Sequence, residues 1–153
     1  MDVTSMPNPK NNPKKPTPVD TTENPYYATI MTHFPRFRFK SGKKFAYHPP
    51  KTIIVGPPEP RSELLLLHEV SHATLHHTTY LTDVERLRIE SEAWDRAHIL
   101  AEELDIPFDT DFAESHLDSY RDWLHNRSLC PHCHITRYQT PDGHYHCPSC
   151  DHI

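Results

Sequence analysis

The sequence predicts an α+β protein in which a small antiparallel sheet packs on a helical core and a four-cysteine module follows. Three observations predict it: short β-branched or alternating segments within residues 37–55, three stretches of helical apolar spacing within 61–125, and two late Cys-x-x-Cys pairs. A chain of 153 residues suffices for one ordinary domain and a small appended module. We therefore expect a tail over residues 1–25, a main domain over 26–127 and the cysteine module over 128–153.

The composition excludes several classes of protein. With 16 basic and 21 acidic residues the net charge is −5, which argues against holding duplex DNA by charge alone. Only three glycines are present, so GxGxxG and Walker-type nucleotide loops are excluded. The chain has no apolar run of membrane-spanning length and no apolar N-terminal signal, so we expect a cytoplasmic protein without membrane contact.

Residues 1–25 combine six prolines with asparagine and lysine and contain almost nothing apolar. Such a segment cannot bury enough surface to offset the entropy lost on ordering. We expect a disordered tail.

The sheet is predicted over three short segments. Aromatic and basic residues alternate over residues 37–40, and residues 45–47 follow a turn centred on Gly42. Residues 52–55 are rich in β-branched side chains and come after Pro49-Pro50. Successive strands joined by short turns predict antiparallel pairing.

Three helices are predicted next. The first, over residues 61–77, contains four consecutive leucines and therefore belongs in the interior. The second opens with the capping-box sequence Thr82-Asp83-Val84-Glu85, continues to about residue 104 and ends before Pro107. The third covers residues 109–125.

The leucine-rich helix carries the sequence His68-Glu69-Val70-Ser71-His72. Residues four apart lie one turn apart on the same face, so His68 and His72 can bind one Zn²⁺. Glu69 can reach a zinc-bound water, whose pKa falls toward ~7, and take its proton. The alternative, two exposed histidines on a surface helix, conflicts with the leucines that open this helix.

A third protein ligand is expected from the second helix. On a helical wheel Glu90 lies on the apolar face with Ala93, Trp94 and Ala97, whereas Glu92 lies about 200° away. A buried carboxylate needs a partner, and zinc supplies one. We therefore predict Glu90 as the ligand, with His98 as the next candidate. The alternative is that Glu90 pairs with an arginine at the rim of a groove.

These residues resemble a known family. The segments HEVSHATLHH and ESEAWDRAHILAEEL are similar to the ImmA/IrrE group of zinc metallopeptidases, a minimal gluzincin type, over residues 47–107. The resemblance implies that His68, His72 and Glu90 bind the catalytic zinc and that Glu69 is the catalytic base. It also implies that residues 26–127 form a zincin-like metallopeptidase domain.

One residue departs from the family pattern. Gluzincins often carry Asp or Asn four residues after the ligand glutamate, and this chain has Trp94 there. The hydrogen bond that orients a ligand histidine must then come from elsewhere or be absent. The family also places a substrate-binding strand before the motif, for which residues 52–55 are the candidate. His76, His77 and Tyr80 are candidates for stabilising the oxyanion.

All four cysteines lie in the C-terminal module. Two Cys-x-x-Cys pairs separated by thirteen residues are typical of a zinc ribbon, in which four thiolates hold a structural zinc; the ligands would be Cys130, Cys133, Cys147 and Cys150. Residues 138–146 would form its hairpin. Such a ribbon can contact nucleic acid, a protein partner or its own main domain, and these three remain open.

The leading functional expectation is a zinc endopeptidase with one catalytic and one structural Zn²⁺. By family resemblance its protein substrate could be a transcriptional repressor. One alternative is a SprT-like DNA-associated protease, which also joins this motif to a zinc ribbon but uses a third histidine in place of Glu90. The other is a non-catalytic, zinc-stabilised adaptor or regulator.

Overall fold

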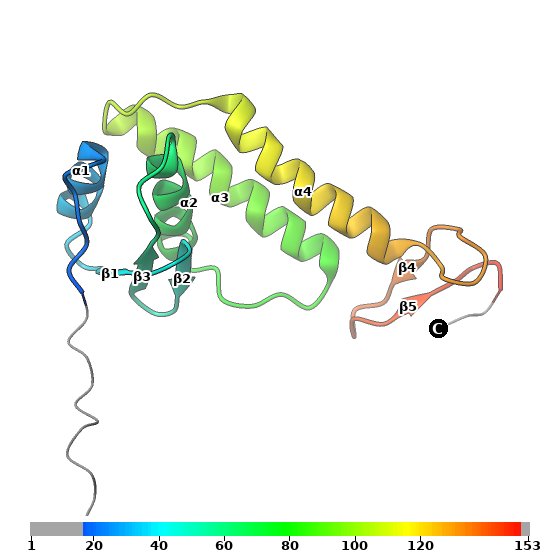
Figure 1. Ribbon diagram of the computed structural model, residues 1–153. Helices are drawn as coiled ribbons and strands as arrows, with labels where there is room; N and C mark the ends of the chain where they lie inside the picture. The colour runs from blue at the N-terminus through cyan, green and yellow to red at the C-terminus, as the bar shows by residue number, and fades with distance from the viewer. Residues whose placement is uncertain (1–16, 151–153) are drawn as a thin grey trace, which may run out of the picture.

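The computed structural model describes residues 17–150 (Figure 1). Most of the predicted tail, residues 1–16, lies outside the described residues, as do residues 151–153. The described part is a mixture of helices and short strands, which confirms the predicted α+β class. In chain order its elements are α1 (Pro25–His33), β1 (Arg38–Ser41), β2 (Ala46–His48), β3 (Thr52–Val55), α2 (Ser62–Thr74), α3 (Asp83–Glu103), α4 (Thr110–Ser128), β4 (Tyr138–Gln139) and β5 (Tyr145–His146).

The first sheet is mixed, so the prediction of an antiparallel sheet is wrong for one strand. The strand order is β1-β3-β2, with β2 antiparallel and β1 parallel to β3. The chain reaches this order by crossing the end of β3 at Gly42, whose N–H donates to the Val55 carbonyl at 3.0 Å. A Cβ on Gly42 would lie 2.3 Å from the side chain of Ile54, so only glycine fits this crossing.

Helix α2 forms the centre of the core. It lies between α1, the sheet and α3 (Figure 1), and Leu64, Leu66 and Leu67 are fully buried. Helix α3 begins with the predicted capping box, since the Thr82 side chain accepts from the Glu85 N–H and Glu85 bonds back to Thr82. Leucine burial therefore fixes the interior position of the helix that carries His68 and His72.

Helix α2 ends three residues earlier than predicted. His76 adopts a left-handed conformation with φ 56°, and the N–H of His77 donates to the His72 carbonyl at 3.0 Å. This pattern closes the helix like a Schellman motif and turns the chain back over its last turn. His77 is thereby placed beside His72.

Helix α1 was not predicted. Asn24 caps it by accepting from the Tyr26 N–H at 3.1 Å, and Pro25 stands in its first turn. Asn24 also donates to the Glu63 carboxylate at 3.0 Å, and Tyr27 is 1% exposed. The end of the predicted tail, residues 24–25, thus belongs to the folded domain.

No helix within residues 17–150 combines the length and the apolar character needed to cross a membrane.

Candidate metal centres and cleft

Two helices bring His68, His72 and Glu90 together. His68 Nε2 lies 2.9 Å from Glu90 Oε2 and 3.0 Å from His72 Nε2, and His72 Nε2 lies 3.4 Å from Glu90 Oε1. One ligand atom from each of the three residues lies within 4.8 Å of those of the other two, and all three residues are buried. Two imidazole nitrogens and one carboxylate can hold a metal ion, as the sequence predicted.

The protonation states of this cluster suit metal binding. Burial alone would raise the pKa of Glu90, but hydrogen bonds from His68 and His72 outweigh it and bring the pKa to about 2. Burial lowers the pKa of His68 more strongly than its contacts with Glu90 raise it. Near neutral pH the carboxylate is therefore ionised and the His68 imidazole neutral, which are the forms that bind metals.

A second layer of polar contacts lies behind His72. His77 Nδ1 is 3.0 Å from His72 Nδ1, and His77 Nε2 is 3.0 Å from Glu92 Oε2. If His77 donates through Nε2 to Glu92, its Nδ1 accepts from the Nδ1–H of His72. This assignment leaves the Nε2 lone pair of His72 directed at the metal position. His77, predicted as an oxyanion candidate, lines the second cavity and also lies where it can orient His72.

Within the described part of the chain, no hydrogen bond orients the His68 ring in the way that His77 orients His72. Its Nδ1 atom is buried and has no hydrogen-bond partner among the described residues. The ring of Trp94 lies 4.4 Å from the His68 ring at an interplanar angle of 33°, and Trp94 is 3% exposed. Trp94 thus holds His68 by packing.

Glu69 lies beside this cluster and has a strongly shifted pKa. Burial and the negative charge of Glu90 outweigh the lowering by His72 and the backbone N–H of Tyr47 and bring the pKa to about 7. A carboxyl group with this pKa can accept and release a proton near neutral pH.

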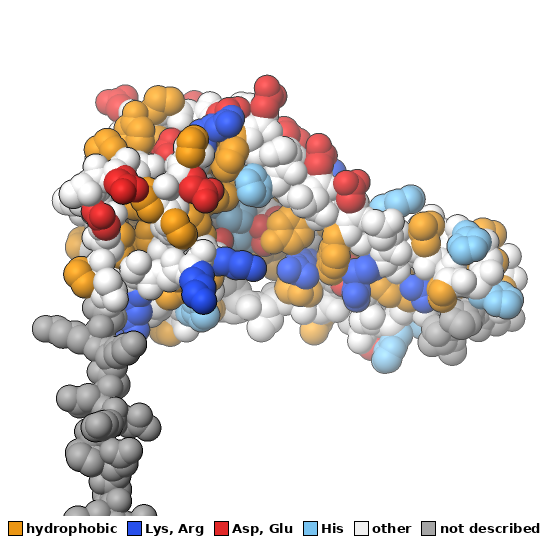
Figure 2. All heavy atoms as spheres, in the orientation of Figure 1, with side chains coloured by type: hydrophobic (Ala, Val, Ile, Leu, Met, Phe, Trp, Pro, Cys, Tyr) orange, Lys and Arg blue, Asp and Glu red, His pale blue; other side chains and the backbone are white. Residues whose placement is uncertain are grey.

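Two cavities meet at the cluster. Their volumes are about 340 and 330 Å³, and both are lined by Phe45, His68, Glu69, Glu90 and Tyr120. Figure 2 shows a hollow on this face, with histidine side chains at its wall. The three potential ligands and Glu69 therefore line a continuous cleft between the sheet and α4.

The strand that borders the cleft is β2, not residues 52–55 as predicted. Ala46 and Tyr47 of β2 line the second cavity, whereas β3 is paired on both sides. A central strand has no free backbone groups for another strand, so only β2 offers an edge here.

None of the remaining predicted site residues belongs to the group of His68, His72 and Glu90. The His98 side chain is 51% exposed, pairs with Glu102 and stacks on Phe108, so it does not join His68 and His72. His76 is exposed. Tyr80 lines the second cavity and is 45% exposed.

The four cysteines form a second cluster. Cys130 Sγ lies 3.5 Å from Cys150 Sγ, Cys133 Sγ lies 3.4 Å from Cys147 Sγ, and all four sulfurs lie within 4.8 Å. Burial raises the pKa of Cys130, but backbone N–H groups of Cys133 and His132 outweigh it and bring the pKa to about 6. The thiolate is the form of cysteine that binds metals, and the four sulfurs converge, so this group too can hold a metal ion.

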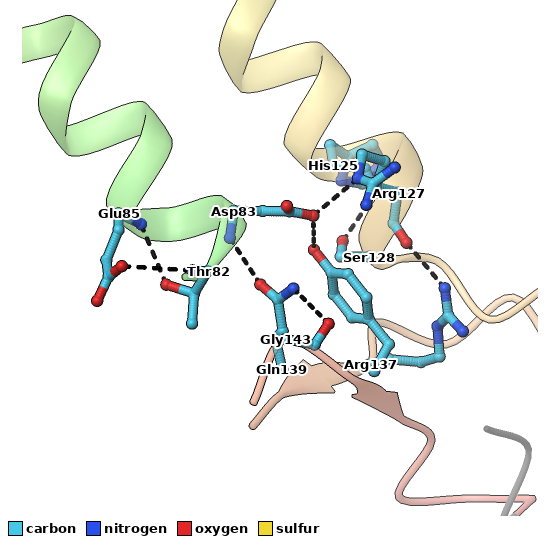
Figure 3. A network of polar contacts seen from close by, with 10 residues as sticks. Thr82, Asp83, Glu85, His125, Arg127, Ser128, Arg137, Gln139 and Gly143 are labelled. Atoms are coloured by element: carbon cyan, nitrogen blue, oxygen red, sulfur yellow. Dashed lines mark hydrogen bonds and ion pairs between the residues drawn. The ribbon is translucent and has the colours of Figure 1, made fainter. Parts of the chain in front are cut away.

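The cysteine module docks on the main domain through Asp83 (Figure 3). The Asp83 carboxylate accepts from Arg127 Nε at 2.8 Å and from Tyr145 Oη at 2.5 Å, and its backbone N–H donates to Gln139 Oε1 at 2.7 Å. Arg137 donates to the Arg127 carbonyl at 2.9 Å. The sequence left open whether the cysteine module contacts nucleic acid, a protein partner or its own main domain. The described residues show the contact with the main domain.

Comparison of the chain with models of protein families, with curated proteins and with solved structures finds no match.

Proposed function

We propose that the protein is a zinc-dependent endopeptidase acting on a protein substrate. The observation that carries the proposal is the convergence of His68, His72 and Glu90, with Glu69 beside them, at the meeting point of two cavities. Two histidines and one glutamate are a ligand set of catalytic zinc sites, which leave one position open. Four cysteine thiolates match a closed, structural zinc site.

Different residues of the chain would supply the different parts of peptide-bond hydrolysis. Zinc, when bound, would polarise the peptide carbonyl and lower the pKa of water toward ~7. Glu69 would take the proton from the attacking water and deliver it to the leaving amine. The free edge of β2 would hold the substrate in an extended conformation along the cleft.

The cysteines and the motif segments also support a compartment and a kind of substrate. Thiolates of a four-cysteine site persist as metal ligands in a reducing compartment, which supports a cytoplasmic enzyme. The resemblance of the motif segments to ImmA/IrrE peptidases supports a transcriptional repressor as the kind of substrate to test first.

Replacement of the proposed base tests this function. Glu69→Gln should abolish cleavage of unfolded, fluorescently labelled casein while the metal content stays unchanged. Glu103→Gln, which alters an exposed acid at the end of α3, should cleave like the wild type. Cleavage at the wild-type rate by Glu69→Gln, or no cleavage by metal-loaded wild type, would contradict the proposal.

The residue that joins the two histidines bears on one alternative, and the cleavage experiment decides the other. A SprT-like protease acting on DNA-bound proteins would require a third histidine ligand, and the residue that joins His68 and His72 here is Glu90. A zinc-stabilised adaptor or regulator would keep both metals and cleave nothing.

A further inference from the structure

Outside the metal site, three of the four charged Lys, Arg, Asp and Glu residues that line the two cavities are cations. Although the chain has a net charge of −5, Lys43 and Lys44 line the first cavity and Arg86 lines the second. Apart from Glu69 and Glu90 at the metal site, Glu59 is the acidic residue among those that line these two cavities. Figure 2 shows Lys and Arg side chains in a row along the lower edge of the hollow, with acidic side chains gathered along the upper edge.

Arg86 is held in place by aromatic rings rather than by an acid. Its guanidinium carbon lies 4.7 Å from the ring centroid of Trp123 and 5.4 Å from those of Tyr80 and Tyr120. No carboxylate within residues 17–150 forms an ion pair with it. Arg86 also hydrogen-bonds the Tyr120 hydroxyl. Stacking on rings leaves its other in-plane N–H groups free to bind a carboxylate.

The opposite half of the cleft carries two lysines. Lys43 and Lys44 lie in the turn between β1 and β2, are exposed, and form no ion pair with a described carboxylate. They stand at the start of the strand whose edge borders the cleft. An extended peptide along this edge would pass the lysines at one end of the cleft and Arg86 at the other.

We propose that the cleft selects peptide segments with carboxylates on both sides of the cleaved bond, one bound by Arg86 and the other by Lys43 and Lys44. This inference rests on the proposed peptidase function and adds a substrate class to it. The carboxylate at Arg86 can belong to an acidic side chain or to the free C-terminus of the peptide, because both present the same planar anion.

A random dodecapeptide library tests the inference on the full chain carrying both metals. Mass spectrometry of the products should show Asp and Glu enriched on both sides of the cleaved bonds. A fluorogenic peptide made from the preferred sequence should lose about tenfold in kcat/KM when its acid facing Arg86 is changed to the amide, since charged hydrogen bonds of this kind are lost. If amidation of the C-terminus alone causes that loss, the terminal carboxylate is the group recognised.

Variants connect the preference to the named cations. Arg86→Gln should cleave the acidic and amide peptides at similar rates, and Arg86→Lys should keep part of the preference. Lys43→Ser/Lys44→Ser, which changes only exposed side chains and should fold normally, should lose the preference on the other side. Arg121→Gln, on the outer face of α4, should behave like wild type.

The outcomes distinguish this inference from the function on which it rests. Cleavage of the library without enrichment of acids, or an acidic preference unchanged in Arg86→Gln and in the double lysine variant, would overturn the inference and leave the peptidase standing. Absence of any cleavage by metal-loaded wild type would overturn both.

Discussion

His77 and His72 face each other through their Nδ1 atoms at 3.0 Å, and Glu92 supports the far side of the His77 ring. The contact depends on the left-handed residue His76, which ends α2 and turns His77 back onto the last helical turn. His72, a member of the group that can hold a metal ion, is thus oriented by a residue five positions further along the chain. Glu90 of α3 contacts the His72 ring directly, whereas Glu92 of the same helix acts on it only through His77.

Removal of this support should weaken metal binding. We expect His77→Ala to lower the affinity of the His68–His72–Glu90 site for zinc by about 10- to 100-fold, the usual effect of losing an outer-shell partner. Competition with a chelating dye measures this affinity. His76→Gly removes an exposed side chain and suits the left-handed backbone at this position, so it should bind zinc like the wild type. Equal affinities in His77→Ala and wild type would show that His72 needs no such orientation.

Trp94 should stabilise the folded protein by packing on His68, not by a hydrogen bond to it. Because its buried ring packs on His68, Phe108 and Phe112, Trp94→Ala should lower the free energy of unfolding by about 3–5 kcal/mol. Urea denaturation measures this loss. Ile99→Ala on the same helix, at a residue 47% exposed, should cost well under half as much. Similar losses in both variants would contradict the packing role of Trp94.

Asp83 should stabilise the junction between the main domain and the cysteine module. Burial raises the pKa of Asp83, but bonds from Arg127 and Tyr145 outweigh it, so the pKa lies below the ordinary value of 3.8. A depressed pKa contributes stability that is present above the unfolded pKa and is lost as the pH falls through the folded pKa. At pH 7 we therefore expect Asp83→Asn to cost about 1–3 kcal/mol in urea denaturation.

The pH dependence supplies the check on that assignment. The difference in stability between wild type and Asp83→Asn should shrink as the pH falls below about 4. Asp95→Asn, at an exposed acid of α3, should differ little from wild type throughout. A difference for Asp83→Asn that stays constant down to about pH 3 would contradict a role for the carboxylate charge.

The elements that sequence periodicity predicted correctly are those whose determinants are local. The leucines of α2 and the Thr82–Glu85 capping box lie within one or two turns of chain, and the structure has both as expected. Glu90 was placed on the inner side of α3 by the same periodicity, and it lies beside His68. Helix α1 was missed because its cap follows a proline-rich segment and its buried face is short.

Features that depend on tertiary contacts could not be predicted from patterns in the sequence. Parallel pairing of β1 follows from the crossing at Gly42, which no local pattern encodes. The roles of His77 and Glu92 depend on how α2 ends and on which face of α3 packs beside that end. Tyr120 reaches the cleft from α4, far along the chain from Glu90, and no motif spacing marks it.

Zinc content tests the central claim most directly. After dialysis against a weak chelator, mass spectrometry should find two zinc ions per wild-type chain, one in Glu90→Ala, one in Cys147→Ser and none in the double variant. His98→Ala, with its exposed imidazole, should keep two. A wild type that holds a single zinc, or a Glu90→Ala variant that keeps both, would contradict the His68–His72–Glu90 site.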